Sequence, residues 1–174
     1  MKPLEGKKVL MVIAHTNFRD EEYAEPRAVL EEQGAAVTVA SSAPGPCTGM
    51  LGARAQPDLL LEHAKAADYD AVLFIGGSGA SEYWDDPRAH ALAREAAALD
   101  RVVGAICIAP VTLAKAGLLR GRRATCYPSE AGQLQAHGAR HTGAGVERDG
   151  NLVTADGPRS AKAFGLAVAK ALGG

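Results

Sequence analysis

Short apolar runs alternate along the chain with segments of helical pattern. The apolar runs are continuous and do not alternate with polar residues, which is typical of parallel strands covered on both faces. They predict strands over 8–14, 36–41, 71–75, 101–105 and 124–127. Helices are predicted between them, over 21–33, 87–99, 110–116, 129–137 and 160–172. The alternation indicates a doubly wound α/β sandwich around a mainly parallel sheet.

Turn-forming residues mark where these elements end. Gly34 follows the first helix, as glycine commonly does at a helix end, and Ser160 is a candidate N-cap of the last. Asp149-Gly150 predicts a tight hairpin turn between two short strands. Residues 42–57 are rich in Pro and Gly and are expected to form a loop with a small hairpin, whereas 59–67 are compatible with either a short helix or an extended segment.

The 174 residues fit a single domain over 1–174, because no linker, repeat or low-complexity tract interrupts them. Folds of this class place their sites at the carboxyl ends of strands. That rule brings together four loops, over 15–18, 76–81, 106–109 and 127–130. The side chains expected to converge there are those of His15, Glu22, Ser78, Cys107 and Tyr127.

Cys107 lies on the predicted turn between a buried strand and a helix that begins at Pro110. Such an elbow lifts one side chain above the sheet edge and directs the first amides of the helix toward it. A thiol at the positive end of a helix is expected to have a lowered pKa. The alternative is a buried structural cysteine, since free cysteines are among the most buried residues.

Glu22 in the first turn of the first helix also has two interpretations. It is either a solvated carboxylate that favours the helix dipole, or a carboxyl that faces the cleft and shares a proton with the Cys107 sulfur. His15 is either a base near Cys107 or a residue that only lines its loop.

The Gly76-Gly77-Ser78-Gly79 loop follows a predicted strand but lacks the spacing and the lysine of nucleotide-binding loops. It is either a tight turn or one side of an oxyanion hole, in which the amides of Gly77 or Ser78 and of Ile108 face a developing negative charge. Tyr83 and Trp84 are expected to line the cleft mouth or to pack at a dimer interface.

Composition excludes several other classes of function. The net charge of −1, without a basic stripe, argues against a nucleic-acid partner. Three scattered cysteines predict neither a disulfide framework nor a zinc site, and they suit a reducing cytoplasm. His137 and His141 lack a third ligand, so no metal is expected. No apolar run is long enough for a membrane span.

Three stretches together resemble the ThiJ/PfpI superfamily, also called DJ-1/PfpI, which is related to class I glutamine amidotransferases. They are Glu22 with Pro26 four residues on, the strand-ending Ile75-Gly76-Gly77, and Ala105-Ile106-Cys107 with Pro110 and the helix beyond it. The resemblance covers essentially the whole chain. It implies a flavodoxin-like sandwich, a strained Cys107 hydrogen-bonded to the Glu22 carboxyl, a homodimer, and neither metal nor organic cofactor.

Activities in the superfamily include glutathione-independent glyoxalase, deglycation, peptidase activity and oxidative-stress sensing, and fold alone does not choose among them. Ile108 stands where peptidase-type members carry histidine, which argues against an intracellular cysteine peptidase. Tyr127 stands where some members carry another histidine. The first hypothesis is an enzyme, of hydrolase or lyase type, that converts small reactive carbonyls such as methylglyoxal to lactate with Cys107 as nucleophile. The second is a redox-responsive stress protein with an oxidisable Cys107, and the third is a noncatalytic binding module.

Overall fold

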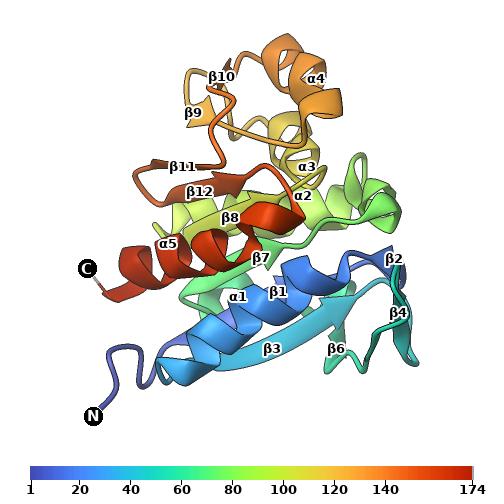
Figure 1. Ribbon diagram of the computed structural model, residues 1–174, viewed down its shortest axis with the longest axis vertical. Coiled ribbons are helices and arrows are strands. Elements are labelled where there is room, and N and C mark those ends of the chain that lie inside the picture. Colours follow the sequence, from blue (N-terminus) through green and yellow to red (C-terminus); the bar gives the residue numbers. More distant parts are fainter. Residues whose placement is uncertain (174) are drawn as a thin grey trace.

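The computed structural model describes residues 1–173 and has a central sheet of seven strands (Figure 1). The spatial order is β11-β12-β8-β7-β1-β3-β6, and every neighbouring pair is parallel except β11 with β12. In chain order the strands are β1 Lys8–Val12, β3 Ala36–Ser41, β6 Leu59–Leu60, β7 Ala71–Phe74, β8 Val102–Ile106, β11 Val146–Asp149 and β12 Leu152–Ala155. The predicted doubly wound α/β sandwich is confirmed.

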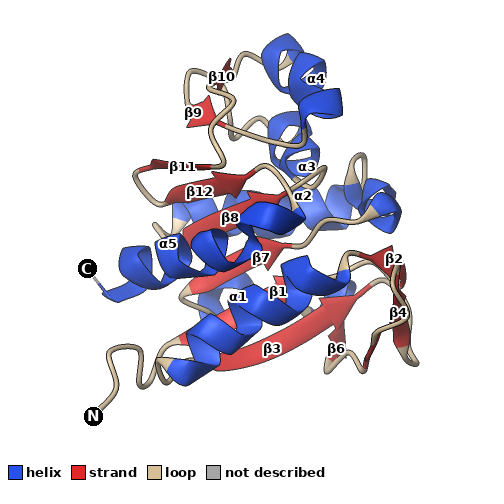
Figure 2. Ribbon diagram, viewed as in Figure 1, coloured by secondary structure: helices blue, strands red, loops and turns tan. Residues whose placement is uncertain are grey.

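Helices cover both faces of this sheet (Figure 2). On one face α1 (Asp20–Glu32) packs against α5 (Ala161–Gly173). On the other lie α2 (Pro87–Ala98) and α3 (Pro110–Lys115), and the short α4 (Ala131–Ala136) packs on α3 at one end of the molecule. Among the described residues, no helix has the length and apolarity needed to cross a bilayer.

Side chains on the two faces of each central strand belong to two separate hydrophobic cores. In β1, Val9 and Met11 join the core under α1 and α5, whereas Leu10 and Val12 join the core under α2 and α3. Both sets are fully buried, as the period of two along a strand requires when both faces are covered. This burial explains why the strands are continuous apolar runs in the sequence.

The expected strand over 124–127 is largely wrong. Only β9 (Arg123–Ala124) forms, and it pairs with β10 (Arg140–His141) in a separate two-stranded sheet. The backbone beyond it finds other partners: the Thr125 amide donates to Thr154 Oγ1 at 3.0 Å, and the Tyr127 amide donates to the Cys107 carbonyl at 2.8 Å. These residues are thereby held against the elbow and do not extend the central sheet.

The segments with weak sequence signals form short elements. The expected hairpin within 42–57 is present as β4 (Cys47–Gly49) and β5 (Arg54–Ala55), which join β2 (Thr16–Phe18) in a three-stranded sheet. The ambiguous 59–67 segment contains β6 and the 3-10 turns η1 (Leu61–His63) and η2 (Ala66–Asp68). Three further 3-10 turns are η3 (Ser78–Tyr83), η4 (Pro128–Glu130) and η5 (Pro158–Ser160).

The last helix begins one residue later than expected. Ser160 closes η5, and its hydroxyl donates to Asp156 Oδ1 at 2.6 Å. The predicted Asp149-Gly150 turn joins β11 to β12, and Gly150 has a φ of 63°. That left-handed conformation suits glycine at a tight hairpin turn.

Candidate active site

Cys107 follows β8 directly, on the turn that leads into α3. Its φ of 65° lies in the left-handed region, which is uncommon for a residue other than glycine. The surrounding backbone fixes this conformation: the Cys107 amide donates to the Ala155 carbonyl at 2.9 Å, and the Cys107 carbonyl accepts from the Tyr127 amide. A strained backbone held in this way often marks a functional position.

Glu22 is fully buried beside this thiol. Its carboxyl lies next to the Cys107 sulfur and the Gly76 amide, and neither carboxyl oxygen has a hydrogen bond of good geometry within residues 1–173. The interpretation of Glu22 as a solvated carboxylate is therefore wrong. The start of α1, the helix that carries Glu22, is held against the end of β7, because the Arg19 amide donates to the Gly76 carbonyl at 2.8 Å.

Gly76 lies against both Glu22 and Cys107 and admits no side chain. A Cβ added there would overlap Glu22 Oε1 and would lie 2.6 Å from the Cys107 Cβ. Pro26 lies one turn beyond Glu22 in α1 and has no amide hydrogen to donate to the Glu22 carbonyl. The Pro26 ring instead lies against Gly165 of α5, where an added Cβ would come within 2.8 Å of the Pro26 Cα.

Burial raises the pKa of Glu22 from 4.5 to about 8, and the neighbouring Cys107 thiol and Arg19 charge oppose this increase. Removal from water disfavours the charged form of a carboxyl, whereas a hydrogen bond or a nearby cation favours it. Glu22 therefore keeps a proton through neutral pH and is able to donate it.

The expected lowering of the thiol pKa by the helix is wrong. Burial and then the Glu22 charge raise the pKa of Cys107 to about 12, against the Gly77 and Ile108 amides, which lower it. Because α3 has only six residues, its dipole is weak compared with these two effects. The two raised pKa values belong to one interacting pair. When Glu22 holds the proton, the charge that opposes a thiolate on Cys107 is absent.

The Gly77 and Ile108 amides lower the pKa of the Cys107 thiol. That these amides form an oxyanion hole stays a prediction. Gly77 has a φ of 107°, and an added Cβ would overlap the Arg19 amide nitrogen, so glycine is required there. The Ser78 amide instead donates to Met50 Sδ at 3.4 Å. Ser78 therefore lies at the site without directing its amide to Cys107.

A cavity of about 1130 Å³ opens over Cys107. Tyr127 lines it with 46% of its surface exposed, and Ser78, Ile108 and Trp84 line it as well. Sequence reasoning missed several further lining residues, namely Arg19, Glu21, Glu25, Met50, Asp156 and Arg159. Asp156 and Arg159 follow β12, so the rule that sites form at carboxyl ends of strands would have found them.

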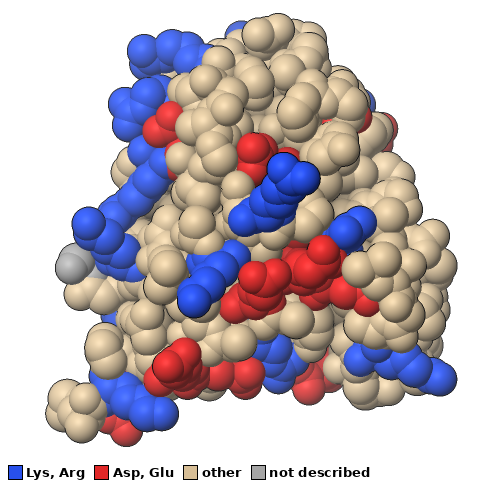
Figure 3. All heavy atoms as spheres, in the orientation of Figure 1, with Lys and Arg blue, Asp and Glu red and all other residues tan. Residues whose placement is uncertain are grey.

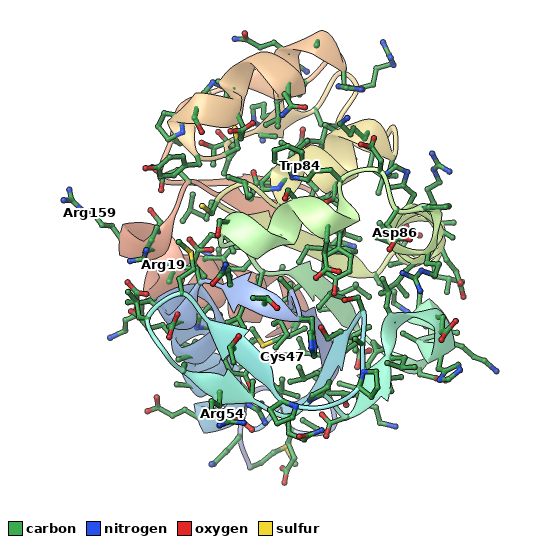
Figure 4. The ribbon with its side chains drawn as sticks, turned by 90° about the vertical axis from the view of Figure 1, so that its right-hand side faces the viewer. Arg19, Cys47, Arg54, Trp84, Asp86 and Arg159 are labelled. Carbon is green, nitrogen blue, oxygen red and sulfur yellow. The ribbon has the colours of Figure 1, made fainter. Side chains whose placement is uncertain are left out.

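The structure does not bring His15 to Cys107. The chain turns after β1 into β2, and His15 Nδ1 lies 3.9 Å from the sulfur of Cys47. In Figure 4 Cys47 lies within the small sheet, apart from Trp84 at the elbow. Glu22 is therefore the titratable group next to Cys107.

Charge near the cavity is of mixed sign. Arg19 and Glu21 form an ion pair with 2.9 Å between Nε and Oε1, at the start of α1. Acidic side chains gather over this part of the surface with basic side chains on either side (Figure 3). Within the described residues no three His, Cys, Asp or Glu side chains are placed to hold a metal ion, and His137 bonds instead to the Gln133 carbonyl at 2.9 Å.

Comparison with known proteins agrees with this geometry. The sequence model of the DJ-1/PfpI family matches residues 7–171. The chain belongs to the DJ-1/PfpI family. An uncharacterized protein of Methanocaldococcus jannaschii is 42% identical over 97% of this chain and 84% of its own length. A Pyrococcus horikoshii protein named as a deglycase is 32% identical over 87% of this chain and 90% of its own.

A solved ThiJ/PfpI domain protein from Brachyspira murdochii has the same fold, with a TM-score of 0.93. It is 35% identical, and the match covers 96% of this chain and 98% of that one. The elbow, the glycine pair and the buried glutamate all lie within the residues that the family model matches. The chemistry at that arrangement follows from this chain's own residues.

Proposed function

We propose that this protein is a cysteine-dependent enzyme that acts on small reactive carbonyls, converting methylglyoxal to lactate. The observation that carries the proposal is the contact between the Cys107 thiol and the buried carboxyl of Glu22, whose pKa is raised to about 8, beneath an open cavity. Relatives named as deglycases, from Pyrococcus horikoshii and Pyrococcus furiosus, support a carbonyl substrate.

The reaction starts from the pair after it has lost one proton to solvent, with the remaining proton on Glu22 and a thiolate on Cys107. In the first step the Cys107 thiolate adds to the aldehyde carbon, and the carbonyl electron pair moves to oxygen. We assign the stabilisation of this oxygen to the amides of Gly77 and Ile108, which lower the pKa of the thiol. Glu22 then gives its proton to that oxygen, which completes a hemithioacetal.

Glu22, now a carboxylate, takes the proton from the former aldehyde carbon and returns it to the neighbouring carbon, while the hydroxyl proton of the former aldehyde carbon passes to the oxygen of its neighbour. The electron pair of the broken C–H bond passes through an enediol, so one carbon is oxidised and its neighbour is reduced without an external oxidant. The product is a lactoyl thioester of Cys107. One water molecule hydrolyses it and releases lactate and the free thiol.

Turnover of methylglyoxal by the purified protein, followed as lactate formed, tests this proposal. We expect Cys107→Ser to abolish turnover and Glu22→Gln to reduce it strongly, since each removes a reacting group. Cys126→Ser, a buried cysteine outside the cavity lining, is the matched control and should retain activity. Full turnover by Cys107→Ser would contradict the proposal.

A redox-responsive role is the second candidate. A related structure from Toxoplasma gondii, 28% identical with a TM-score of 0.83, is described as oxidized DJ-1. Peroxide oxidises a thiolate first to sulfenic and then to sulfinic acid, with one water released at each step. A protonated Glu22 and the two amides would donate to the sulfinate oxygens. This role requires oxidation at Cys107 without carbonyl turnover.

Peptidase chemistry has less support. Ile108 occupies the position after the nucleophile, and its carbonyl accepts from the Trp84 indole at 3.0 Å. His15, the other histidine considered, lies beside Cys47. No imidazole is therefore placed next to Cys107 in the described part of the chain to activate it for attack on a peptide bond.

A further inference from the structure

Trp84 reaches the elbow from a loop 23 residues earlier in the chain. It directly follows η3, is half-buried, and lines the same cavity as Cys107 (Figure 4). Its indole Nε1 donates to the Ile108 carbonyl with 3.0 Å between nitrogen and oxygen. This is a side-chain hydrogen bond to the residue that follows Cys107 and whose own amide lowers the pKa of the Cys107 thiol.

The other hydrogen bonds of the elbow come from backbone. The Cys107 amide and carbonyl bond to Ala155 and Tyr127, and the Ala109 amide donates to the Ile106 carbonyl at 3.1 Å. These bonds hold the peptides on either side of Cys107. The Ile108 carbonyl accepts from the Val111 amide at 3.3 Å and, over the shorter distance of 3.0 Å, from the Trp84 indole. The Trp84 bond is therefore the side-chain restraint on the rotation of Ile108.

Trp84 is itself fixed from both sides. The His90 ring bonds through Nε2 to the Trp84 carbonyl at 2.7 Å. The next residue, Asp85, forms an ion pair with Lys115 at the end of α3, with 3.0 Å between Oδ1 and Nζ. The loop after β7 and the helix after the elbow are thereby joined, and Trp84 lies between them.

We propose that Trp84 is a positioning residue, whose indole N–H fixes Ile108 so that the Ile108 amide stabilises the charged form of Cys107. It acts through Ile108 and not through the substrate. The proposal deepens the proposed function, because it assigns a residue that maintains the reactive state of the same thiol. Nothing in the sequence pattern around Trp84 indicates this contact.

Trp84→Phe tests the proposal, because it keeps an aromatic ring and removes the donor. The probe is iodoacetamide, and the measurement is its rate of reaction at Cys107 against pH, read on the Cys107 peptide. Tyr83→Phe is the matched control, since it removes a neighbouring aromatic donor that bonds to the Ile13 carbonyl at 2.7 Å, away from the elbow.

We expect Trp84→Phe to lower the rate at neutral pH by about three- to tenfold, the worth of one hydrogen bond, and to move the profile to higher pH. Tyr83→Phe should leave the profile in place. An unchanged profile in Trp84→Phe, or an equal displacement in both variants, would overturn the proposal. Because alkylation needs no carbonyl turnover, absence of lactate would defeat the proposed function and not this inference.

A measurement on the unmodified protein gives a second test that does not depend on the folding of any variant. Trp84 is the only tryptophan of the chain, so its indole N–H gives a single NMR signal. We expect that signal to be protected from solvent exchange and to shift when iodoacetamide modifies Cys107. An indole that exchanges freely and does not respond would overturn the proposal.

Discussion

The carboxyl of Glu22 and the thiol of Cys107 meet against the bare backbone of Gly76. Each group comes from a different element, the first turn of α1 and the elbow after β8. Both groups are buried at this contact, which disfavours the charged form of each. Their pKa values are both raised, Glu22 to about 8 and Cys107 to about 12.

Replacing Gly76 with alanine should destroy this contact. The added methyl would overlap the Glu22 carboxyl and lie 2.7 Å from the Ile106 carbonyl oxygen, closer than packed atoms tolerate. We expect destabilisation of about 2 kcal/mol or more and loss of Cys107 reactivity, measured by denaturant unfolding and alkylation.

Gly132→Ala is the control for that substitution. Gly132 lies in α4, where an added Cβ meets nothing within 4 Å, so alanine should be neutral or stabilising by about 1 kcal/mol. A fully stable and reactive Gly76→Ala protein would contradict the described packing of Glu22 and Cys107.

The raised pKa of Glu22 predicts a pH dependence of stability. Between pH 4.5 and about 8 the folded protein holds a proton on Glu22 that the unfolded chain has released. The stabilisation is fully present below pH 4.5 and is lost as pH rises through about 8. At about 1.4 kcal/mol per pH unit, the whole shift corresponds to about 5 kcal/mol as an upper limit.

Glu22→Gln removes this titration, so its stability relative to the wild-type protein should increase as pH rises from 5 to 8. Denaturant unfolding at several pH values measures the difference. Glu32→Gln, at the exposed end of the same helix, should track the wild-type curve. A constant difference between Glu22→Gln and wild type at all pH values would show that Glu22 is ionised throughout.

Peroxide should modify the three cysteines unequally. Cys107 faces the cavity and is 9% exposed, whereas Cys126 is 1% and Cys47 0% exposed and neither lines that cavity. We expect two added oxygens on the Cys107 peptide before any change at the other two, read by mass spectrometry. Equal oxidation of all three would remove the case for a redox role.

The homodimer implied by the family resemblance remains a prediction. Met50 and Leu51, 42% and 65% exposed, form an apolar pair beside the cavity. We expect Leu51→Glu to shift the protein from dimer to monomer in sedimentation velocity, and Leu99→Glu, at a similarly exposed position after α2, to have no effect. A wild-type monomer at micromolar concentration would refute the prediction.

The sequence predicted the central strands β1, β3, β7 and β8, the helices that cover them and the Cys107 elbow, because the patterns that mark them are local. Continuous apolar runs mark these strands, and Gly104, the small alanines around Cys107 and Pro110 mark the turn into α3. The burial of Glu22 was open from sequence alone, since an acidic residue in a first helical turn is ordinarily solvated. Only the packing of α1 on the end of β7 shows that the Glu22 carboxyl is buried.

The remaining differences have long-range causes. His15 follows β1 as Gly76 follows β7, but pairing of β2 with β4 carries His15 to Cys47. The expected lowering of the Cys107 pKa considered the helix and omitted burial. The contact between Trp84 and Ile108 joins two loops by a single side chain, which no periodicity reveals.

The pH dependence of iodoacetamide labelling at Cys107, in wild type and in Glu22→Gln, tests the central claim most directly. If the two groups share protons, Cys107 labels faster than Cys126 at neutral pH, and the wild-type profile departs from a single titration near pH 8, where Glu22 ionises. Glu22→Gln should then follow one titration curve. Identical single-step profiles in both proteins would show that Cys107 titrates alone and would contradict the account.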